Sequence, residues 1–433
     1  MRVRLFRKRL TGYREPHEVF ALLSVRARAL GVGSPAGLCG EWFGSRAVLA
    51  PAIRPAPVED PFALLEEQPV VAGAPGAVGG GWFGYLSYDL TDPAGKSGGL
   101  PKAAWGWADH VLRLDSDGQW WFEALVPDHV PDPSGAEFEE LLSRAVVPVG
   151  WEPTSLRHPL PHHDAIKACV LAIEDGELFQ ANICTRFTGP FAGSPADLFA
   201  EGVRTLRPRR AAYLEGDWGA VVSFSPELFL SRHGDLVRST PIKGTLPRRG
   251  PADDHLAQRL RESAKDVAEN VMITDLVRND LGRVCAVGTV RVPELLAVRP
   301  APGVWHLEST VEGRLAPGRT DADLLRATFP PGSVTGAPKI RALDLIAELE
   351  PAARGVYTGA IGLVSPVAGL ELNVAIRTLE IQHGRIALGV GGGITADSDP
   401  AVEWEECLHK SAPLEALLAA GIQHELADRA ARP

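Results

Sequence analysis

The chain has 433 residues and a formal net charge of −10, and 45% of its residues are hydrophobic. This length and apolar content suffice for one large or two ordinary domains, while the negative balance excludes a nucleic-acid binder that needs a broad basic surface. No apolar run approaches the ~18 residues of a membrane span, and the basic start MRVRLFRKRL lacks the apolar stretch of a signal peptide. The five cysteines show no C-x-x-C spacing, so we expect a cytoplasmic protein with reduced thiols.

Residues 1–150 are predicted to form an N-terminal region of short strands, because apolar runs alternate there with glycine and proline. Residues 82–86 follow three glycines, which is typical of a buried strand after a turn. Residues 110–126 alternate in polarity around an Asp-Gly pair, which predicts a β-hairpin. The proline-rich residues 127–160, with one short helix near 136–145, are the best linker candidate. A second region is therefore predicted over 161–425.

From residue 161 onward the pattern changes to long strands separated by helices. Helices are predicted near 163–175 and over 261–283, and a last helix begins near 399. Strands are predicted at 176–187, 219–234, 235–245, 356–365, 370–382 and 385–395. Paired long strands with helices between groups of them indicate an α+β protein with large, mostly antiparallel sheets.

Two predicted helices each carry a pair of acidic residues at a spacing of three. Asp266 and Glu269 lie on the first, Glu403 and Glu406 on the last, and Lys410 follows on the same side of the last helix. Carboxylates from two helices could supply the hard oxygen ligands that Mg²⁺ prefers. Two solvated helix faces are the alternative.

Two glycine-rich stretches and two isolated polar residues are further candidates. Gly391, Gly392 and Gly393 follow a predicted strand and would let backbone N–H groups approach an anion. GSVTGAPK (332–339) is a second such turn, with hydroxyls and a lysine; an ordinary turn is the alternative for both. Arg377 lies in an otherwise apolar predicted strand, where its charge is costly unless it meets an anion. His306, between apolar residues, is more typical of a core residue.

Lys243 in STPIKGTLP is notable because only eight of the 44 Lys and Arg residues are lysines. A desolvated lysine can lose its proton and act as a nucleophile, whereas an arginine cannot. A solvated surface lysine is the alternative.

From about residue 165 to 412 the order and spacing of the motifs resemble the chorismate-utilising enzymes, the family of anthranilate, aminodeoxychorismate, isochorismate and salicylate synthases. The matching motifs are GELFQANICTRF, SFSPELFL, PIKGT, KDVAENVMITDLVRNDLGR, HLEST, FPPGSVTGAPK, YTGAIG, AIRT, GGGITADS and EWEECLHK. GEWFGSRAVL and GGWFGYLSY resemble the family's first half. The resemblance implies an anthranilate synthase component I-like αββα fold: two large, mostly antiparallel sheets packed face to face, outer helices, and both regions intertwined in one unit.

Within this family three features resemble the aminodeoxychorismate synthase branch. Gln180 stands where members that hydrate chorismate carry a lysine, and glutamine cannot serve as a general base at neutral pH. PIKGT and KDVAEN match the aminodeoxychorismate pattern, whereas anthranilate synthases usually read PIAGT and KE..EH. Anthranilate synthase component I is the alternative, and a catalytically dead chorismate-binding homologue is the remote one.

The resemblance also implies roles. Lys243 would attack C2 of the chorismate ring, Glu227 would help the C4 hydroxyl to leave, and ammonia would then attack C4 and expel the lysine. Mg²⁺ would bind Glu269 and Glu406, with Asp266 and Glu403 near it or bound through water. The remaining site residues would hold the enolpyruvyl carboxylate (Arg377, Tyr357 and the amides of Gly391 to Gly393), assist at the ring carboxylate (Lys410) or line the ring pocket (His306, Thr335).

Three further expectations concern partners and departures from the family pattern. No segment resembles a glutaminase domain, so we expect ammonia to come from a separate glutamine amidotransferase, component II, or from solution, and the product to serve 4-aminobenzoate and folate synthesis or a related secondary pathway. Ser45, in a segment where relatives bind tryptophan, could contact a tryptophan head group; a plain strand with its aromatic residues in the core is the alternative. Pro413 should kink or end the last helix.

Overall fold

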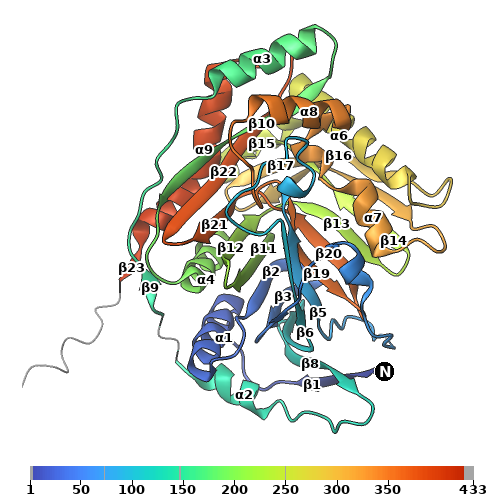
Figure 1. Ribbon diagram of the computed structural model, residues 1–433, viewed down its shortest axis with the longest axis vertical. Coiled ribbons are helices and arrows are strands. Elements are labelled where there is room, and N and C mark those ends of the chain that lie inside the picture. Colours follow the sequence, from blue (N-terminus) through green and yellow to red (C-terminus); the bar gives the residue numbers. More distant parts are fainter. Residues whose placement is uncertain (1–2, 73, 146–147, 249, 424–433) are drawn as a thin grey trace, which may run out of the picture.

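The structure is a computed structural model that describes residues 3–72, 74–145, 148–248 and 250–423. Two large β-sheets form its centre (Figure 1). Within these residues the first sheet has eleven strands, in the order β1 (Val3–Arg9), β8 (Trp120–Pro127), β7 (His110–Asp115), β3 (Ser45–Ala50), β2 (Ala36–Trp42), β11 (Arg210–Gly216), β12 (Gly219–Ser225), β21 (Thr378–Gln382), β22 (Arg385–Ile394), β10 (Gln180–Pro190) and β18 (Gly336–Ala337).

The second sheet is also antiparallel throughout its described pairings. Its order is β15 (Ile242–Pro247), β17 (Val304–Arg314), β14 (Leu236–Thr240), β13 (Leu228–His233), β20 (Gly369–Val374), β19 (Ala360–Ser365), β5 (Gly81–Leu86), β6 (Ala103–Ala108) and β4 (Arg54–Pro55), with β16 (Arg291–Ala301) paired to β17. A small third sheet joins β23 (Ile422–Gln423) to β9 (Gly150–Trp151).

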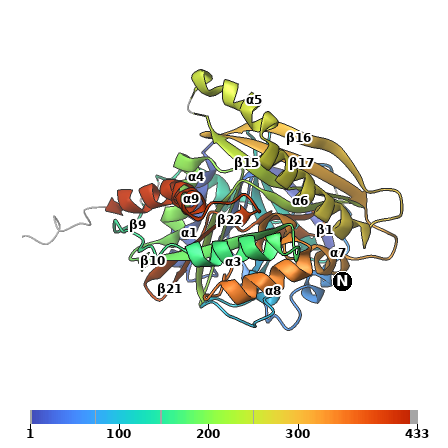
Figure 2. The same ribbon diagram turned by 90° about the horizontal axis from the view of Figure 1, so that it is seen from above.

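The helices lie on the outer faces of the two sheets. They are α1 (Pro16–Leu30), α2 (Ala136–Ser143), α3 (His163–Glu174), α4 (Pro195–Leu206), α5 (His255–Glu262), α6 (Ala264–Gly282), α7 (Asp321–Thr328), α8 (Lys339–Leu349) and α9 (Pro400–Ala420), with 3-10 turns η1 (Ala63–Glu66), η2 (Tyr88–Leu90), η3 (Pro251–Asp253) and η4 (Gly332–Val334). Figure 2 shows α5 and the ends of β15 and β16 at the outer edge of the molecule. In the described part of the chain no helix is long and apolar enough to span a membrane.

Four apolar cores hold the layers of the described chain together. Between the sheets, residues of β2 and β11 such as Leu38 and Leu214 pack with residues of β5 and β19 such as Phe83 and Leu363. A second core joins α1, α4 and α9 to the outer face of the first sheet, and a third joins α6 and α7 to the second sheet. A fourth joins α3 and α8 to β10. The predicted αββα fold with two face-to-face antiparallel sheets is therefore confirmed.

Strands from the two predicted regions pair within both sheets. β2 pairs with β11 in the first sheet, and β5 pairs with β19 in the second. The boundary near residue 150 therefore does not separate the strands into two sheets. The predicted second region, 161–425, ends two residues beyond the described part of the chain.

Several predicted elements are interrupted where the sequence pattern runs on. The predicted helix 261–283 consists of the end of α5 and all of α6, because Ser263 caps α6 by accepting a hydrogen bond from the Asp266 N–H at 3.3 Å. The predicted strand 219–234 divides into β12 and β13, and 235–245 divides into β14 and β15. The hairpin at 110–126 is confirmed as β7 and β8.

The last helix does not end at Pro413. α9 runs from Pro400 to Ala420 with Pro413 inside it, although proline removes one helical hydrogen bond. Leu414, Leu417 and Leu418 follow it and are buried in the first-sheet core. Their burial offsets the cost of the missing hydrogen bond, so the helix continues.

Candidate active site

Two crossings of the chain between the sheets place Glu227 and Arg377. Glu227 lies between β12 of the first sheet and β13 of the second, and Arg377 lies where the chain returns from β20 to β21. The crossings are hydrogen-bonded side by side: Val374 N–H donates to the Glu227 carbonyl at 3.1 Å, and Phe224 N–H donates to the Arg377 carbonyl at 3.0 Å. Arg377 was predicted inside a strand; it instead occupies the turn, with φ of 50°.

Lys243 sits in a β-bulge at the edge of the second sheet. Ile242 pairs with Glu308 and Thr245 pairs with His306, so Lys243 and Gly244 together stand opposite one residue of β17. Bulges re-aim side chains beside functional sites. Gly244 has φ of 89°, and a Cβ at this position would lie 3.0 Å from the Asp266 side chain. The lysine-glycine pair of PIKGT therefore serves one purpose, which is to turn the lysine inward while the strand passes close to α6.

Gln180, Lys243 and Glu269 converge on Gly393 of β22. A Cβ on Gly393 would lie 2.2 Å from Gln180 Nε2, 2.9 Å from Lys243 Nζ and 3.2 Å from Glu269 Oε2. Gln180 donates to Glu269 Oε2 at 3.3 Å, and Lys243 Nζ lies 3.8 Å from the same oxygen. Only glycine leaves room for these three side chains. The structure thus brings together three residues that are widely separated in the sequence.

A second group gathers at Gly392, on the opposite face of the strand. A Cβ there would lie 3.0 Å from Glu403 Oε2, 3.7 Å from Glu406 Oε1 and 3.9 Å from Lys410 Nζ. Lys410 pairs with Glu406 at 2.5 Å and donates to the Gly391 carbonyl at 2.8 Å. The predicted glycine run therefore lies within β22, paired with β10, rather than in a turn after a strand.

The two groups are joined where α6 and α9 begin. Lys265 of α6 donates to Glu403 Oε1 of α9 at 3.3 Å. Burial raises the pKa of Glu269, and the neighbouring carboxylates of Asp266 and Glu406 add to the rise. Glu269 thus lies near Asp266 and Glu406, and Lys265 links this group to Glu403.

These carboxylates do not form a ready-made metal cage. Within the described ranges, no three His, Cys, Asp or Glu side chains are grouped so that they could hold a metal ion. The donor chemistry nevertheless suits Mg²⁺, which prefers carboxylate oxygens. Glu403 is 2% exposed, and its Oε2 atom has no hydrogen-bond partner among the described residues. A buried carboxylate oxygen without a partner is costly, and a cation would satisfy it.

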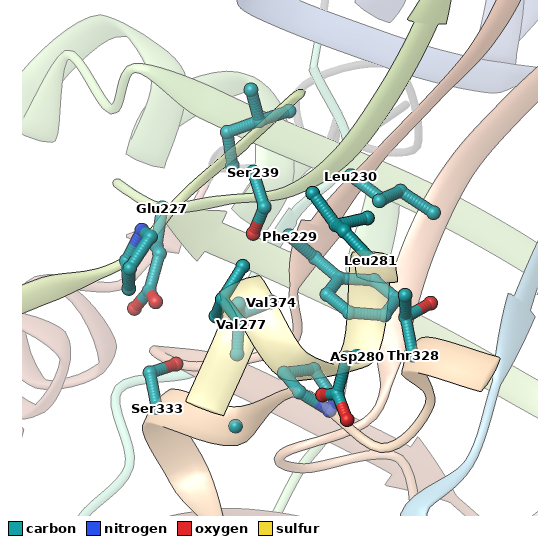
Figure 3. A pocket seen from close by; sticks show the side chains of 14 residues that line it. Glu227, Phe229, Leu230, Ser239, Val277, Asp280, Leu281, Thr328, Ser333 and Val374 are labelled. Carbon is teal, nitrogen blue, oxygen red and sulfur yellow. The ribbon is translucent and has the colours of Figure 1, made fainter. Parts of the chain in front are cut away.

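Glu227 is a buried carboxyl group at one end of a pocket (Figure 3). Burial raises its pKa to about 7, while a hydrogen bond with Ser333, the Ile242 N–H and the charge of Lys243 oppose the rise. Figure 3 shows Ser333 facing Glu227, with Asp280 and Thr328 at the far end of the pocket. A carboxyl group with this pKa can hold a proton near neutral pH and release it.

His306 and Arg377 lie near each other beside Glu227's crossing. His306 is buried, and burial together with the charges of Arg377 and Arg209 lowers its pKa to about 3, so the ring is neutral. Thr245 Oγ1 bonds its Nδ1 atom at 3.1 Å, and its Nε2 atom has no partner in the described chain. Burial lowers the pKa of Arg377, and no described acidic side chain forms an ion pair with it. The positive charge of Arg377 is therefore available to an anionic ligand, and the His306 Nε2 atom is available to a hydrogen-bonding group.

Tyr357 and Thr335 occupy different positions relative to the glycine strand. The Tyr357 ring covers Gly389, where a Cβ would lie 2.2 Å from the ring, and its hydroxyl lies 3.9 Å from Cys184 Sγ. The Thr335 hydroxyl instead donates to the carbonyls of Pro331 and Gly332, at 3.1 and 3.2 Å. Thr335 thus fixes its own turn, and its role toward the ring stays a prediction.

Two buried ion pairs hold the loops of the site. Lys339 of the first belongs to the glycine-rich turn at 332–339, whereas the sequence patterns gave no role to the second, Glu350–Arg354. Lys339 donates to Asp280 at 2.6 Å and to the carbonyls of Thr328 and Pro330, which ties the loop before Ser333 to the end of α6. Arg354 pairs with Glu350 at 2.6 Å and donates to groups on three site segments: the Asn182 and Val334 carbonyls and the Thr358 hydroxyl.

Ser45 lies away from these groups, in the N-terminal part of the first sheet. Its hydroxyl accepts a hydrogen bond from Arg113 at 3.2 Å, and Arg113 also pairs with the buried Glu123 at 2.9 Å. Trp42 and Phe43 pack in the core between the sheets. Tryptophan binding at Ser45 stays a prediction.

Comparisons with known proteins agree with this geometry. The profile of a family described as chorismate binding enzyme matches residues 57–416. The chain is 47% identical to aminodeoxychorismate synthase component 1 of Klebsiella aerogenes over 241 residues, 55% of this chain and 53% of that relative. It is 38% identical to anthranilate synthase component 1 of Streptomyces coelicolor over 401 residues, 83% of this chain and 78% of that relative.

A solved structure shows the same likeness in three dimensions. Anthranilate synthase component I from Streptococcus pneumoniae superimposes with a TM-score of 0.73 at 28% identity, over 83% of this chain and 86% of that chain. The match with the Klebsiella relative spans about half of that relative's length. With a family profile that covers most of its length and a fold shared with a solved member, this chain belongs to the chorismate binding enzyme family.

Proposed function

We propose that the protein is aminodeoxychorismate synthase component I, which converts chorismate and ammonia to 4-amino-4-deoxychorismate. The observation that carries this proposal is the convergence on Gly393, where the inward-turned Lys243 lies beside Gln180 and Glu269. An amine placed inside a site, next to a buried acid, is suited to covalent catalysis. Similarity to relatives named aminodeoxychorismate synthase component 1 supports the same activity.

In this mechanism Lys243 and Glu227 act on opposite ends of the substrate's reacting system. The unprotonated Lys243 amine forms a bond to ring C2, the ring double bonds shift, and the C4–O bond breaks. Glu227 gives its proton to the departing oxygen, which leaves as water. Ammonia then forms a bond to C4, the double bonds shift back, and the Lys243 amine leaves C2. The Glu227 carboxylate is free to accept the proton that the new amine releases.

The anionic groups of chorismate would be held by cations and backbone donors. Arg377, without an acidic partner among the described residues, and Tyr357 would hold the enolpyruvyl carboxylate together with N–H groups of the Gly391–Gly393 segment. The pairing between β21 and β22 ends at Leu388, so the residues of the Gly391–Gly393 segment do not pair with β21. Lys410 would assist at the ring carboxylate.

Glu269 and Glu406 would hold Mg²⁺, with Asp266 and Glu403 beside them. When bound, the metal would neutralise the ring carboxylate and stabilise the charge that develops as the hydroxyl leaves. The free Oε2 atom of Glu403 supports this assignment.

Ammonia would come from a glutamine amidotransferase, as the component 1 names of the relatives suggest. The product would serve 4-aminobenzoate and folate synthesis or a related secondary pathway.

Identification of the products made from chorismate, Mg²⁺ and ammonium by mass spectrometry tests this proposal. The wild-type protein is expected to yield 4-amino-4-deoxychorismate. Lys243→Ala is expected to lose this product, and Lys243→Arg is not expected to restore it, because a guanidinium does not deprotonate to attack. Anthranilate from the wild-type protein would establish the alternative, anthranilate synthase component I. Chorismate binding without turnover would indicate an inactive homologue.

A further inference from the structure

Lys265 is a lysine of the metal-site region to which the proposed mechanism gives no task. It lies in the first turn of α6, and its Nζ atom reaches across to Glu403 Oε1 on α9, 3.3 Å away. The same oxygen accepts a hydrogen bond from Ser398 at 2.7 Å. The other oxygen of Glu403 has no partner among the described residues. The buried Glu403 carboxylate thus has Lys265 as its counter-charge.

The neighbouring Lys410 is held differently. It pairs with Glu406 and also donates to the Gly391 carbonyl in the strand below. For Lys265, Glu403 is the one hydrogen-bond partner found in the described chain, and 44% of the lysine side chain is exposed. Lys265 can therefore move into the solvent by breaking one ion pair. The same movement of Lys410 would break an ion pair and a hydrogen bond to the backbone.

The formal charges of the region point the same way. Around Glu403 and Glu406, the ammonium groups of Lys265 and Lys410 balance the two carboxylates. Withdrawal of Lys265 leaves one net negative charge there, which favours a cation. The absence of a ready-made group of three metal ligands among the described residues fits a site whose carboxylates are held by lysines.

We infer that the ammonium group of Lys265, held on Glu403 Oε1 in the metal-free protein, opposes Mg²⁺ binding at the free Oε2 atom of the same carboxylate. Metal binding then favours withdrawal of Lys265 into water, so the lysine lowers the metal affinity of the free enzyme. This inference rests on the proposed metal site, and it assigns to Lys265 a role in metal affinity rather than in the chemistry.

Calorimetric titration of the full chain with Mg²⁺, without chorismate, tests the inference. Lys265→Met is expected to bind Mg²⁺ about tenfold more tightly than the wild type, the scale of one unit charge acting on a divalent ion in a solvent-accessible site. Lys265→Arg retains the charge and is expected to bind Mg²⁺ with the wild-type affinity.

Lys8→Met is the matched control. Lys8 also forms a half-buried pair with a glutamate, Glu139, at 3.2 Å, but it lies on β1, at the opposite end of the molecule from α6 (Figure 1). Its Mg²⁺ affinity should be unchanged. Equal or weaker Mg²⁺ binding by Lys265→Met would overturn the inference while leaving the metal site standing. Failure of both the wild type and Lys265→Met to bind Mg²⁺ would overturn the metal site and the inference together.

Discussion

Replacing Arg354 by methionine should destabilise the protein strongly. Arg354 is 5% exposed, and its guanidinium makes two hydrogen bonds to Glu350. Its other bonds go to the Asn182 and Val334 carbonyls and the Thr358 hydroxyl. In Arg354→Met the Glu350 carboxylate keeps the Cys184 N–H at 2.8 Å but loses its counter-charge. Removal of one partner from a buried ion pair costs about 3–5 kcal/mol.

Urea unfolding followed by tryptophan fluorescence measures this loss through the midpoint at an unchanged m-value. Arg144→Met is the matched control, because Arg144 pairs with Glu140 at the same spacing and the same 2.6 Å distance as Arg354 with Glu350, but on the surface. We expect a loss of less than about 1 kcal/mol there. The double variant Arg354→Met, Glu350→Gln should recover part of the stability, since no charge is left buried. A loss below about 1 kcal/mol for Arg354→Met would refute the reasoning.

Three further predictions concern activity and ligands. The pKa of Glu227 is raised to about 7, so this residue is protonated below that pH, and kcat/KM should fall as the pH rises above 7. Ser333→Ala should shift this fall to higher pH, because the variant lacks a hydrogen bond that favours the carboxylate. A pH profile unchanged by Glu227→Gln would contradict the assignment. Excess chelator, Glu269→Gln and Glu406→Gln should each abolish turnover of chorismate, and full activity in chelator would rule out the metal. Millimolar tryptophan that binds near Ser45 should raise the melting temperature by mass action. An unchanged melting temperature would contradict a tryptophan site there and would leave the Ser45 hydroxyl as a partner of Arg113 only.

Much of the fold is predictable from the sequence because its causes are local. The Asp-Gly pair at 117–118 sets the turn between β7 and β8. Serine and aspartate caps set the first residues of α6 and α9. The order of the motifs then indicates the family, and with it the two-sheet fold, even where single elements are misjudged.

Other features depend on where the chain passes between layers. Arg377 reads as part of one strand because 370–382 is apolar on both sides of it, yet the chain changes sheets there and the arginine adopts a positive φ. α9 continues past Pro413 because three leucines beyond it reach the core. In both cases packing against distant segments outweighs the local preference.

The site itself is assembled from residues far apart in the chain. Gln180 and Glu269 are 89 residues apart, and Lys265 and Glu403 are 138 apart. Local periodicity places each residue on a helix or strand but contains no information on which of them meet. The PIKGT bulge, which turns Lys243 inward, becomes visible only in its pairing with β17.

Two glutamate–arginine pairs with the same spacing separate what the sequence determines from what only the tertiary structure decides. Glu140–Arg144 and Glu350–Arg354 both read as a glutamate four residues before an arginine, which by itself predicts a solvated pair of small effect. In the structure the first pair stays on the surface, and the second is enclosed by α8, β10 and the turn at Thr358. The sequence determines which charges can pair. Only the tertiary structure decides whether water remains to screen them, and therefore whether the pair is dispensable or holds three segments of the site together.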